Sequence, residues 1–156
     1  MTIIKPYSAL YKDRLLEIFR SNMPLYFADE ELPLFSAFLD NDVVKGNYDM
    51  IFSNQEPVAC GGIALNQPNE FTKEEHVVLT WGMVHSAFHK QGFGKQLLEH
   101  RLHEAYRIYP GVKVALGTTQ HTFRFFEKYG FKTVFFKSNH WAKGLDLYQM
   151  ELSFTN

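Results

Sequence analysis

The chain has 156 residues, of which 46% are hydrophobic and 16% aromatic, and its formal net charge is −1. This length is typical of one domain with a sizeable core. The near-zero net charge removes the usual electrostatic case for nucleic-acid binding, which needs a strongly basic face, but leaves local basic patches open. No stretch approaches the roughly 18 uncharged apolar residues of a membrane helix, so no membrane association is expected. We therefore predict a single domain covering residues 1–156.

The cysteine content and the first residues bear on the cellular compartment. Cys60 is the only cysteine, which rules out an internal disulfide framework. The sequence begins Met1-Thr2-Ile3-Ile4-Lys5 rather than with a charged segment and a long apolar run. We expect a cytoplasmic protein in which Cys60, placed in an apolar segment, is buried and inert.

The first forty residues predict a short strand followed by two helices. The strand covers residues 2–6, and the first helix runs from the capping residue Ser8 to about Arg20, with Leu10 on its buried stripe. The second helix covers residues 29–39 and begins with three acids, Asp29, Glu30 and Glu31. Acids are favoured there by the helix dipole, but they could also attract a cationic amine to the mouth of a cleft.

A hairpin follows the two helices. Strands are predicted over residues 48–53 and 58–66, and the turn between them covers residues 54–57. Gly61 and Gly62 inside the returning strand indicate a bulge or the close approach of another backbone.

Residues 76–109 change from the periodicity of a strand to that of a helix. His76 to Val84 is rich in β-branched and aromatic residues, and an amphipathic helix starts by Lys95. Between them, His89-Lys90-Gln91-Gly92-Phe93-Gly94 places two glycines directly before the exposed N–H groups of a helix start. Because a helix N-terminus favours negative charge and Lys90 and Lys95 add cations, this loop predicts a phosphate or pyrophosphate site.

The loop fits neither of two common phosphate motifs. The Walker pattern requires Ser or Thr after Gly-Lys, but Gln96 follows Gly94-Lys95. The dinucleotide fingerprint requires a third glycine where Leu97 stands.

The last third of the chain predicts a strand, a helix and two strands. The strand covers residues 112–117, and the helix, capped by Thr118 or Thr119, runs from 120 to 129 and ends at Gly130. The last strands cover residues 132–137 and 145–154, and their connection contains His140 and Trp141. The complete order predicts a mixed sheet with helices on both faces.

Two segments together resemble signatures of the GNAT superfamily of N-acetyltransferases. Val84, Gly92 and Gly94 match the acyl-CoA signature Val-x-Pro-x-x-Arg/Gln-x-x-Gly-x-Gly/Ala in register, although Ser86 replaces Pro and His89 replaces Arg or Gln. The second segment, Phe125-Phe126-Glu127-Lys128-Tyr129-Gly130-Phe131, is similar to Phe-Tyr-Glu-Lys-x-Gly-Phe of the family. The order of elements also matches that family, which implies an α+β fold with a mostly antiparallel sheet of about seven strands.

The resemblance implies an N-acetyltransferase that moves the acetyl group of acetyl-CoA to a primary amine of a small molecule or peptide by direct attack on the thioester. By position, the main chain of Gly82, Met83 and Val84 would bind the acyl and pantetheine groups, and Thr119 and Phe126 would line the opposite side. The pyrophosphate would be held by His89, Lys90, Gln91, Gly92, Phe93, Gly94 and Lys95. No metal is expected, because His85 and His89 flank a loop and lack a third ligand nearby.

The proton transfers are not assigned by the resemblance. Phe126 stands where the family often has a Tyr that protonates the departing thiolate. Candidates for the base are His76 and Thr80, on one face of the central strand, and His140, and water could also carry the proton.

Two other functions stay open. The chain could be an acyl-CoA-binding sensor without catalysis, which Phe126 favours. It could also be a dimeric interaction module that uses the aromatic surface near Tyr26, Phe27 and Trp141. Aromatic edge strands make a homodimer reasonable.

Overall fold

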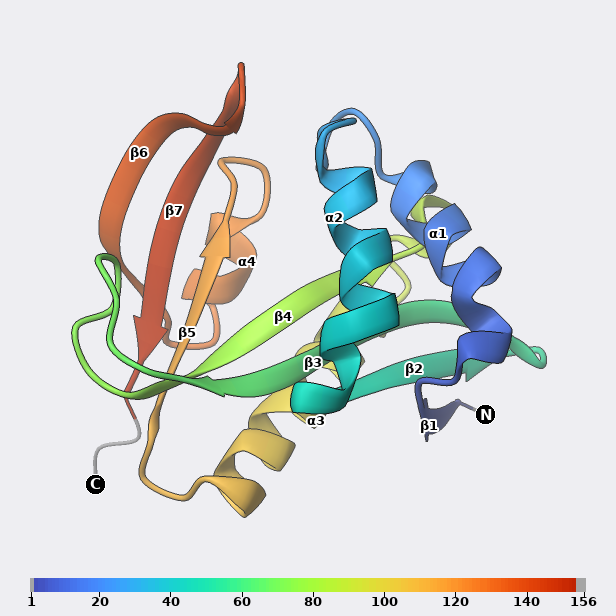
Figure 1. Cartoon of the computed structure of the whole chain (residues 1–156), viewed down its shortest axis with the longest axis horizontal. Helices are drawn as coiled ribbons and strands as arrows, with labels where there is room; N and C mark the ends of the chain where they lie inside the picture. Colours follow the sequence, from blue (N-terminus) through green and yellow to red (C-terminus); the bar gives the residue numbers. More distant parts are fainter. Residues whose placement is uncertain (1, 154–156) are drawn as a thin grey trace.

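A computed structural model, which describes residues 2–153, contains a seven-stranded sheet in the order β1-β2-β3-β4-β5-β7-β6 (Figure 1). Each neighbouring pair is antiparallel except β4 and β5, which are parallel. The strands are β1 Ile3–Pro6, β2 Asn47–Ser53, β3 Glu56–Asn66, β4 His76–Val84, β5 Lys113–Thr118, β6 Lys132–Ala142 and β7 Leu145–Leu152. The α-helices are α1 Lys12–Ser21, α2 Glu31–Ala37, α3 Phe93–Ile108 and α4 Phe123–Glu127.

Two hydrophobic cores lie on opposite faces of the sheet, because successive side chains of a strand point to opposite sides. On β2, Met50 packs in the core under α1 and α2, whereas Ile51 packs in a cluster with α3. The first core includes Leu15, Ile18, Phe19, Phe35, Cys60 and Met83. On the other face, α3 and the residues of α4 pack on a core that includes Ile63, Val77, Leu79, Leu98, Val114 and Leu116. The predicted mixed sheet with helices on both faces is confirmed.

Several local predictions are also confirmed. The hairpin turn predicted over residues 54–57 is present but consists of Asn54 and Gln55 alone, with φ of 52° and 69° that suit tight two-residue turns, and Glu56 and Pro57 already belong to β3. The predicted irregularity at Gly61 and Gly62 is present, since the pairing of β3 with β4 shifts register between Cys60 and Gly62. Close approach is present as well, because a Cβ built on Gly61 would lie 3.1 Å from the Cα of Gly82.

The start of the first helix differs from the prediction. Residues Ala9–Tyr11 form a 3₁₀ turn, in which the hydroxyl of Ser8 accepts a hydrogen bond from Leu10 N–H, and the α-helix begins only at Lys12. A 3₁₀ turn has three residues per turn rather than 3.6. This change of period removes Leu10 from the buried stripe, and Leu10 is 82% exposed.

Two predicted helices are shorter in the structure. The second helix begins at Glu31 rather than Asp29, and a π-helical stretch, Phe38–Asp42, continues it. The helix predicted over residues 120–129 is regular only over Phe123–Glu127, with Thr122 at its N-cap position.

The connection predicted between the last two strands is mostly strand. Residues Ser138 to Ala142 belong to β6, so His140 and Trp141 lie on a strand rather than in a loop. A register shift between Lys137 and Ala142 accommodates this polar segment. Asn139, at φ 54°, donates its N–H to Asp146, and its side chain accepts the N–H of Gly144. The polar residues that indicated a turn thus stabilise a bulged strand.

The buried thiol of Cys60 gives a first prediction. Cys60 is completely buried, and burial raises the pKa of its thiol to about 12. Since only the thiolate reacts with disulfide reagents, the native protein at pH 8 should react at least about a hundredfold more slowly than the urea-denatured protein. Release of the coloured thiol from an aromatic disulfide measures both rates. Reaction of the native protein within seconds would show that Cys60 is accessible.

Candidate active site

The parallel strands β4 and β5 separate soon after they begin. Only their first residues pair: His76 with Lys113, Val77 with Val114 and Val78 with Ala115. Beyond these pairs, β4 continues to Val84 and β5 to Thr118, and Figure 1 shows the two strands diverging. We call this opening, bounded by residues 79–84 of β4 and 116–118 of β5, the β4–β5 wedge. Backbone groups of these residues that face the opening have no partner in the opposite strand, since strands that part cannot satisfy one another. The carbonyls of Trp81, Val84 and Thr118 are not among the free groups, because they accept side-chain hydrogen bonds.

A bulge in β4 bends the strand at the wedge. Trp81 and Gly82 together face the single residue Gly61 of β3, because Cys60 pairs with Met83 and Gly62 with Thr80. Trp81 has a φ of 37°, which few non-glycine residues adopt. Its ring packs under α2, with its centroid 5.2 Å from that of Phe35, while Gly82 stays exposed. Such strain is typical of functional sites.

The loop after β4 leads into the N-terminus of α3. It contains a short 3₁₀ turn, Ser86–Phe88, and two residues with positive φ, Lys90 at 63° and Gly92 at 88°. The N–H of Gln96 donates to the carbonyl of Gly92 at 3.0 Å. The N–H groups before it belong to the first turn, which has no acceptor within the helix, and they are available to an anion. The predicted strand, glycine loop and helix are confirmed, although α3 begins at Phe93 rather than near Lys95.

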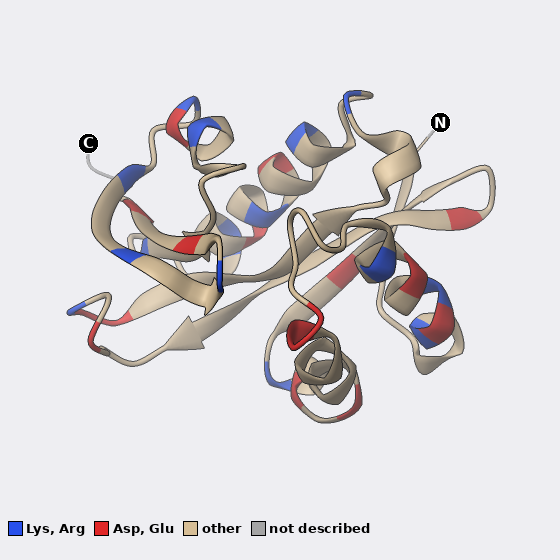
Figure 2. Cartoon of the chain, turned by 90° about the horizontal axis from the view of Figure 1, so that it is seen from above, with Lys and Arg blue, Asp and Glu red and all other residues tan. Residues whose placement is uncertain are grey.

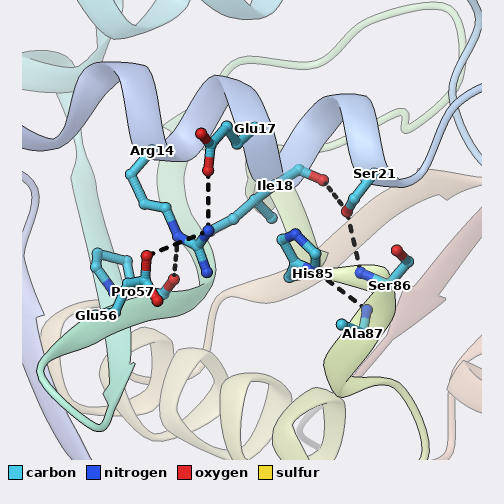
Figure 3. A network of polar contacts seen from close by, with 9 residues as sticks. All are labelled: Arg14, Glu17, Ile18, Ser21, Glu56, Pro57, His85, Ser86 and Ala87. Carbon is cyan, nitrogen blue, oxygen red and sulfur yellow. Dashed lines mark hydrogen bonds and ion pairs between the residues drawn. The ribbon is translucent and has the colours of Figure 1, made fainter.

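Hydrogen bonds join the start of this loop to α1 (Figure 3). The hydroxyl of Ser21 accepts the N–H of Ser86 at 3.0 Å and donates to the carbonyl of Ile18. The ring of His85 accepts the N–H of Ala87 at 3.1 Å. Burial, together with the charge of Arg14, lowers the pKa of His85, which keeps the ring in the neutral form that can accept this bond. The loop is therefore positioned by α1 as well as by the sheet.

His89 is directed at the protein backbone. Its Nε2 lies 2.8 Å from the carbonyl oxygen of Val84, which also accepts a hydrogen bond from Nδ2 of Asn22 at 2.9 Å. Since a carbonyl only accepts, His89 carries its proton on Nε2 in this bond. A neutral His89 then has no second ring N–H to donate to a phosphate. The predicted contact with pyrophosphate would therefore come from the backbone of His89, or from its ring only if both ring nitrogens are protonated.

Tyr26 lies between the two sides of the site. Its ring centroid is 5.6 Å from that of His89 in the loop and 5.9 Å from that of His121, which precedes α4. Both contacts are edge-to-face. The segment between α1 and α2 thus touches the segments that follow β4 and β5.

The other residues predicted to bind the cofactor differ in exposure. Lys90 and Lys95 are exposed, and Nζ of Lys95 is 3.8 Å from Glu99. Thr119 is buried and accepts the N–H of His121 through its hydroxyl. The ring of Phe126 packs edge-to-face on that of Phe131, at 5.8 Å between centroids.

The three residues predicted as bases occupy different places. His76 is buried at the first residue of β4, the end of the strand away from the loop, and its Nδ1 lies 2.8 Å from the carbonyl of Glu74. Thr80 is half-buried just before the bulge. His140, on β6, packs against the rings of Phe71 and Trp141.

A pocket of about 420 Å³ lies between the segment that precedes α2 and the β6–β7 turn. Of the three acids predicted at the start of the second helix, two line this pocket and one does not. Glu31 is buried, and its carboxylate accepts the N–H of Ala28 at 2.9 Å, so it has a structural role. Asp29 and Glu30 are exposed and line the pocket, and Figure 2 shows this acidic segment beside the start of α2. The other lining residues are Pro24, Leu25, Ala28, His121, Ala142, Lys143, Gly144 and Leu145.

Sequence reasoning missed His121 and Asn22 as parts of this region. Asn22 is 5% exposed, and its side chain ties the end of α1 to the carbonyl of Val84. His121 lies in a segment predicted to be helical. Its proximity to Thr119 was the one available signal, because Thr119 was already expected to line the site.

Asp49, His100 and Glu104 bring possible metal-ligating atoms within 4.8 Å of one another on the face of the sheet that carries α3. His100 pairs with Asp49 at 2.7 Å, and Glu104 pairs with Arg107 at 2.8 Å. None of the described helices is long and apolar enough to cross a membrane.

Comparison with known proteins identifies a family. A model described as "Acetyltransferase (GNAT) domain" matches residues 27–154. Curated protein sequences give no significant match.

Solved structures with the same fold include three acetyltransferases. A ribosomal-protein-alanine N-acetyltransferase from Brucella melitensis superposes with a TM-score of 0.76 and 18% identity, over 97% of this chain and 99% of that one. An aminoglycoside 6′-N-acetyltransferase in complex with coenzyme A gives 0.72 and 17%, over 99% and 98%. A GNAT family acetyltransferase from Elizabethkingia anophelis with acetyl-CoA bound gives 0.71 and 19%, over 98% of both chains. At these identities the likeness shows the fold.

Proposed function

The chain belongs to the GNAT family of acetyl-CoA-dependent N-acetyltransferases, and we propose that it transfers the acetyl group of acetyl-CoA to a primary amine of a small molecule or peptide by direct attack of the amine on the thioester. The observation that carries this proposal is the β4–β5 wedge, which opens next to the glycine loop at the N-terminus of α3. We further propose that residues 1–156 act as one acyltransferase domain.

The residues at the wedge and loop fit coenzyme A. The main chain of Gly82, Met83 and Val84 would hold the acyl and pantetheine groups, and the backbone N–H groups from Gln91 to Lys95 would hold the pyrophosphate. A Cβ on Gly92 would have no heavy atom within 4 Å, which leaves open space beside the loop. Lys90 and Lys95 add positive charge to this space. Thr119 and Phe126 would line the opposite side of the wedge.

Bound acetyl-CoA supplies an activated acyl group, and the residues of the chain position it and receive protons. The attacking nitrogen must be uncharged, so an ammonium substrate must lose a proton near the wedge. His76, Thr80 and His140 remain our sequence-based candidates for the base. His121 joins them, because its ring lies at the acceptor pocket. Water could carry the proton from any of these groups.

We propose that the acceptor is a cation bound in the pocket lined by Asp29, Glu30 and His121. The two carboxylates are exposed on one side of the pocket. Lys143, on the β6–β7 side, opposes them and would exclude acceptors with a second positive charge near that turn. Two of the solved relatives are named for a protein alanine and an aminoglycoside as acceptors, so amines of both kinds belong in a substrate screen.

An acyl-CoA-binding sensor is the second candidate function. Phe126 favours it, because a phenyl ring cannot protonate a departing thiolate. Thiol release with a panel of amines distinguishes the two functions, since a sensor binds acetyl-CoA and releases no thiol with any amine. Absence of acetyl-CoA binding at millimolar concentration would contradict both.

The placement of the cofactor loop can be tested with a matched pair of glycine substitutions. Gly92 and Gly111 both have positive φ, 88° and 79°, and neither would place a Cβ near another atom. Valine should therefore destabilise the protein by a similar ~1–2 kcal/mol at either position. Calorimetry should show at least about tenfold weaker coenzyme A binding for Gly92→Val, because the loop shifts and its N–H groups turn away. Gly111→Val should bind like the wild type, and equal affinities of the two variants would refute this placement.

The charge of the pocket predicts acceptor preference. The double variant Asp29→Asn/Glu30→Gln should raise KM for a cationic amine about five- to twentyfold with little change in kcat, because both carboxylates act on binding. Steady-state thiol release measures both constants. Asp13→Asn/Glu70→Gln, which removes the same charge from exposed positions outside the pocket, is the control. If both double variants raise KM equally, the pocket has no specific part in acceptor binding.

A further inference from the structure

Arg101 of α3 is a buried cation without a carboxylate partner. It is 6% exposed, and its Nε is fully buried with no hydrogen-bond partner in the part of the chain that the structure describes. The acids of β2 and α3 pair instead with other residues: Asp49 with His100, Glu99 with Lys95 and Glu104 with Arg107. Burial of a lone charge is costly, so an unpaired guanidinium at this position requires an explanation.

The guanidinium of Arg101 lies directly beneath the bulge of β4. A Cβ built on Gly82 would come within 2.5 to 2.8 Å of three guanidinium atoms of Arg101. The guanidinium therefore occupies the space that a side chain at position 82 would fill. Gly82 is itself exposed at the wedge, so only one backbone residue separates the charge of Arg101 from the ligand space.

The groups around Arg101 leave its charge uncompensated near neutral pH. Its titratable neighbours include Tyr48 of β2, Cys60 of β3 and the adjacent His100, which is paired with Asp49. Burial raises the pKa of Tyr48 well above its usual value, and it raises the pKa of Cys60 to about 12, so both stay neutral. Burial also lowers the pKa of Arg101 to about 10, which still leaves the guanidinium protonated at pH 7.

We propose that the charge of Arg101 stabilises the thiolate of coenzyme A that leaves during acetyl transfer, with the sulfur lying beside Gly82 at the wedge. This proposal rests on the acetyltransferase function proposed above. In the reaction, the amine nitrogen forms a bond to the acyl carbon, the carbon–sulfur bond breaks, and its electron pair stays on sulfur. The proton of the amine goes to the base or to water.

This role of Arg101 explains how the reaction could proceed with Phe126 at the position where the family often has a tyrosine. Where a tyrosine protonates the sulfur, the negative charge of the thiolate is removed by a proton. Here a fixed, buried positive charge lowers the energy of the thiolate itself, and no proton donor is needed at position 126. Arg101 acts across the backbone of Gly82 rather than by contact with the sulfur, so we describe it as an electrostatic positioning residue.

The test is the pKa of the thiol of bound coenzyme A. The ultraviolet absorbance of the thiolate is titrated in the complex, and the complex with desulfo-coenzyme A is subtracted to remove tyrosine ionisation. Cys60 does not interfere, because its pKa is about 12. In the wild type, we expect the thiol pKa to lie at least about one unit, or tenfold in the thiolate equilibrium, below that of free coenzyme A.

Substitutions on α3 assign the effect to Arg101. Arg101→Met should abolish the shift of the thiol pKa, and Arg101→Lys should keep part of it. Arg107→Met, which removes an exposed arginine of the same helix, should leave it unchanged. If Arg101→Met does not fold, the wild type and Arg101→Lys still decide the question. A wild-type thiol that titrates as in free coenzyme A, or a shift that persists in Arg101→Met, would overturn the proposal.

The same experiment separates this proposal from the proposed function. If neither coenzyme A nor its desulfo analogue binds, the acetyltransferase function fails together with this role. If both bind and the thiol is unshifted, only the role of Arg101 fails. As a second readout, Phe126→Tyr should change kcat of the wild type by less than about twofold but raise that of Arg101→Met severalfold. Equal effects in both backgrounds would contradict the proposal.

Discussion

Pairing between β4 and β5 stops at Val78 and Ala115, and the candidate site depends on this limit. In a parallel pair, each backbone group that leaves the ladder must find another partner or remain open to solvent or a ligand. The bulge at Trp81 and Gly82 turns β4 away from β5, and the glycine loop then redirects the chain into α3. One local departure from regular pairing thus creates both the wedge and the position of the anion-binding loop beside it.

The two faces of the sheet contribute differently to this arrangement. On one face, α1 and α2 hold the bulge through the ring of Trp81 and hold the loop through Ser21 and Asn22. On the other face, α3 supplies the helix N-terminus and, two turns later, the buried charge of Arg101. The wedge between strands is therefore supported from both sides by elements whose hydrophobic cores are separate.

The sequence predicted what depends on local pattern. The bounds of β4 from His76 to Val84 and the hairpin turn at Asn54 and Gln55 follow from periodicity and turn chemistry, and the structure confirms them. The β6 bulge and the short α4 were not predictable in this way, because side-chain bonds such as that from Asn139 N–H to Asp146 decide them. The roles of Asn22, His121 and Arg101 depend on contacts between segments far apart in the chain. The periodicity of a single sequence does not reveal such contacts.

The contact between Gly82 and Arg101 also limits how relatives of this chain can vary. A methyl group at position 82 and a guanidinium at position 101 would occupy the same volume. A side chain at position 82 therefore requires either that the guanidinium of Arg101 moves away from the bulge or that a smaller residue stands at position 101. Glycine at position 82 is therefore the feature of β4 that admits a buried cation beside the wedge.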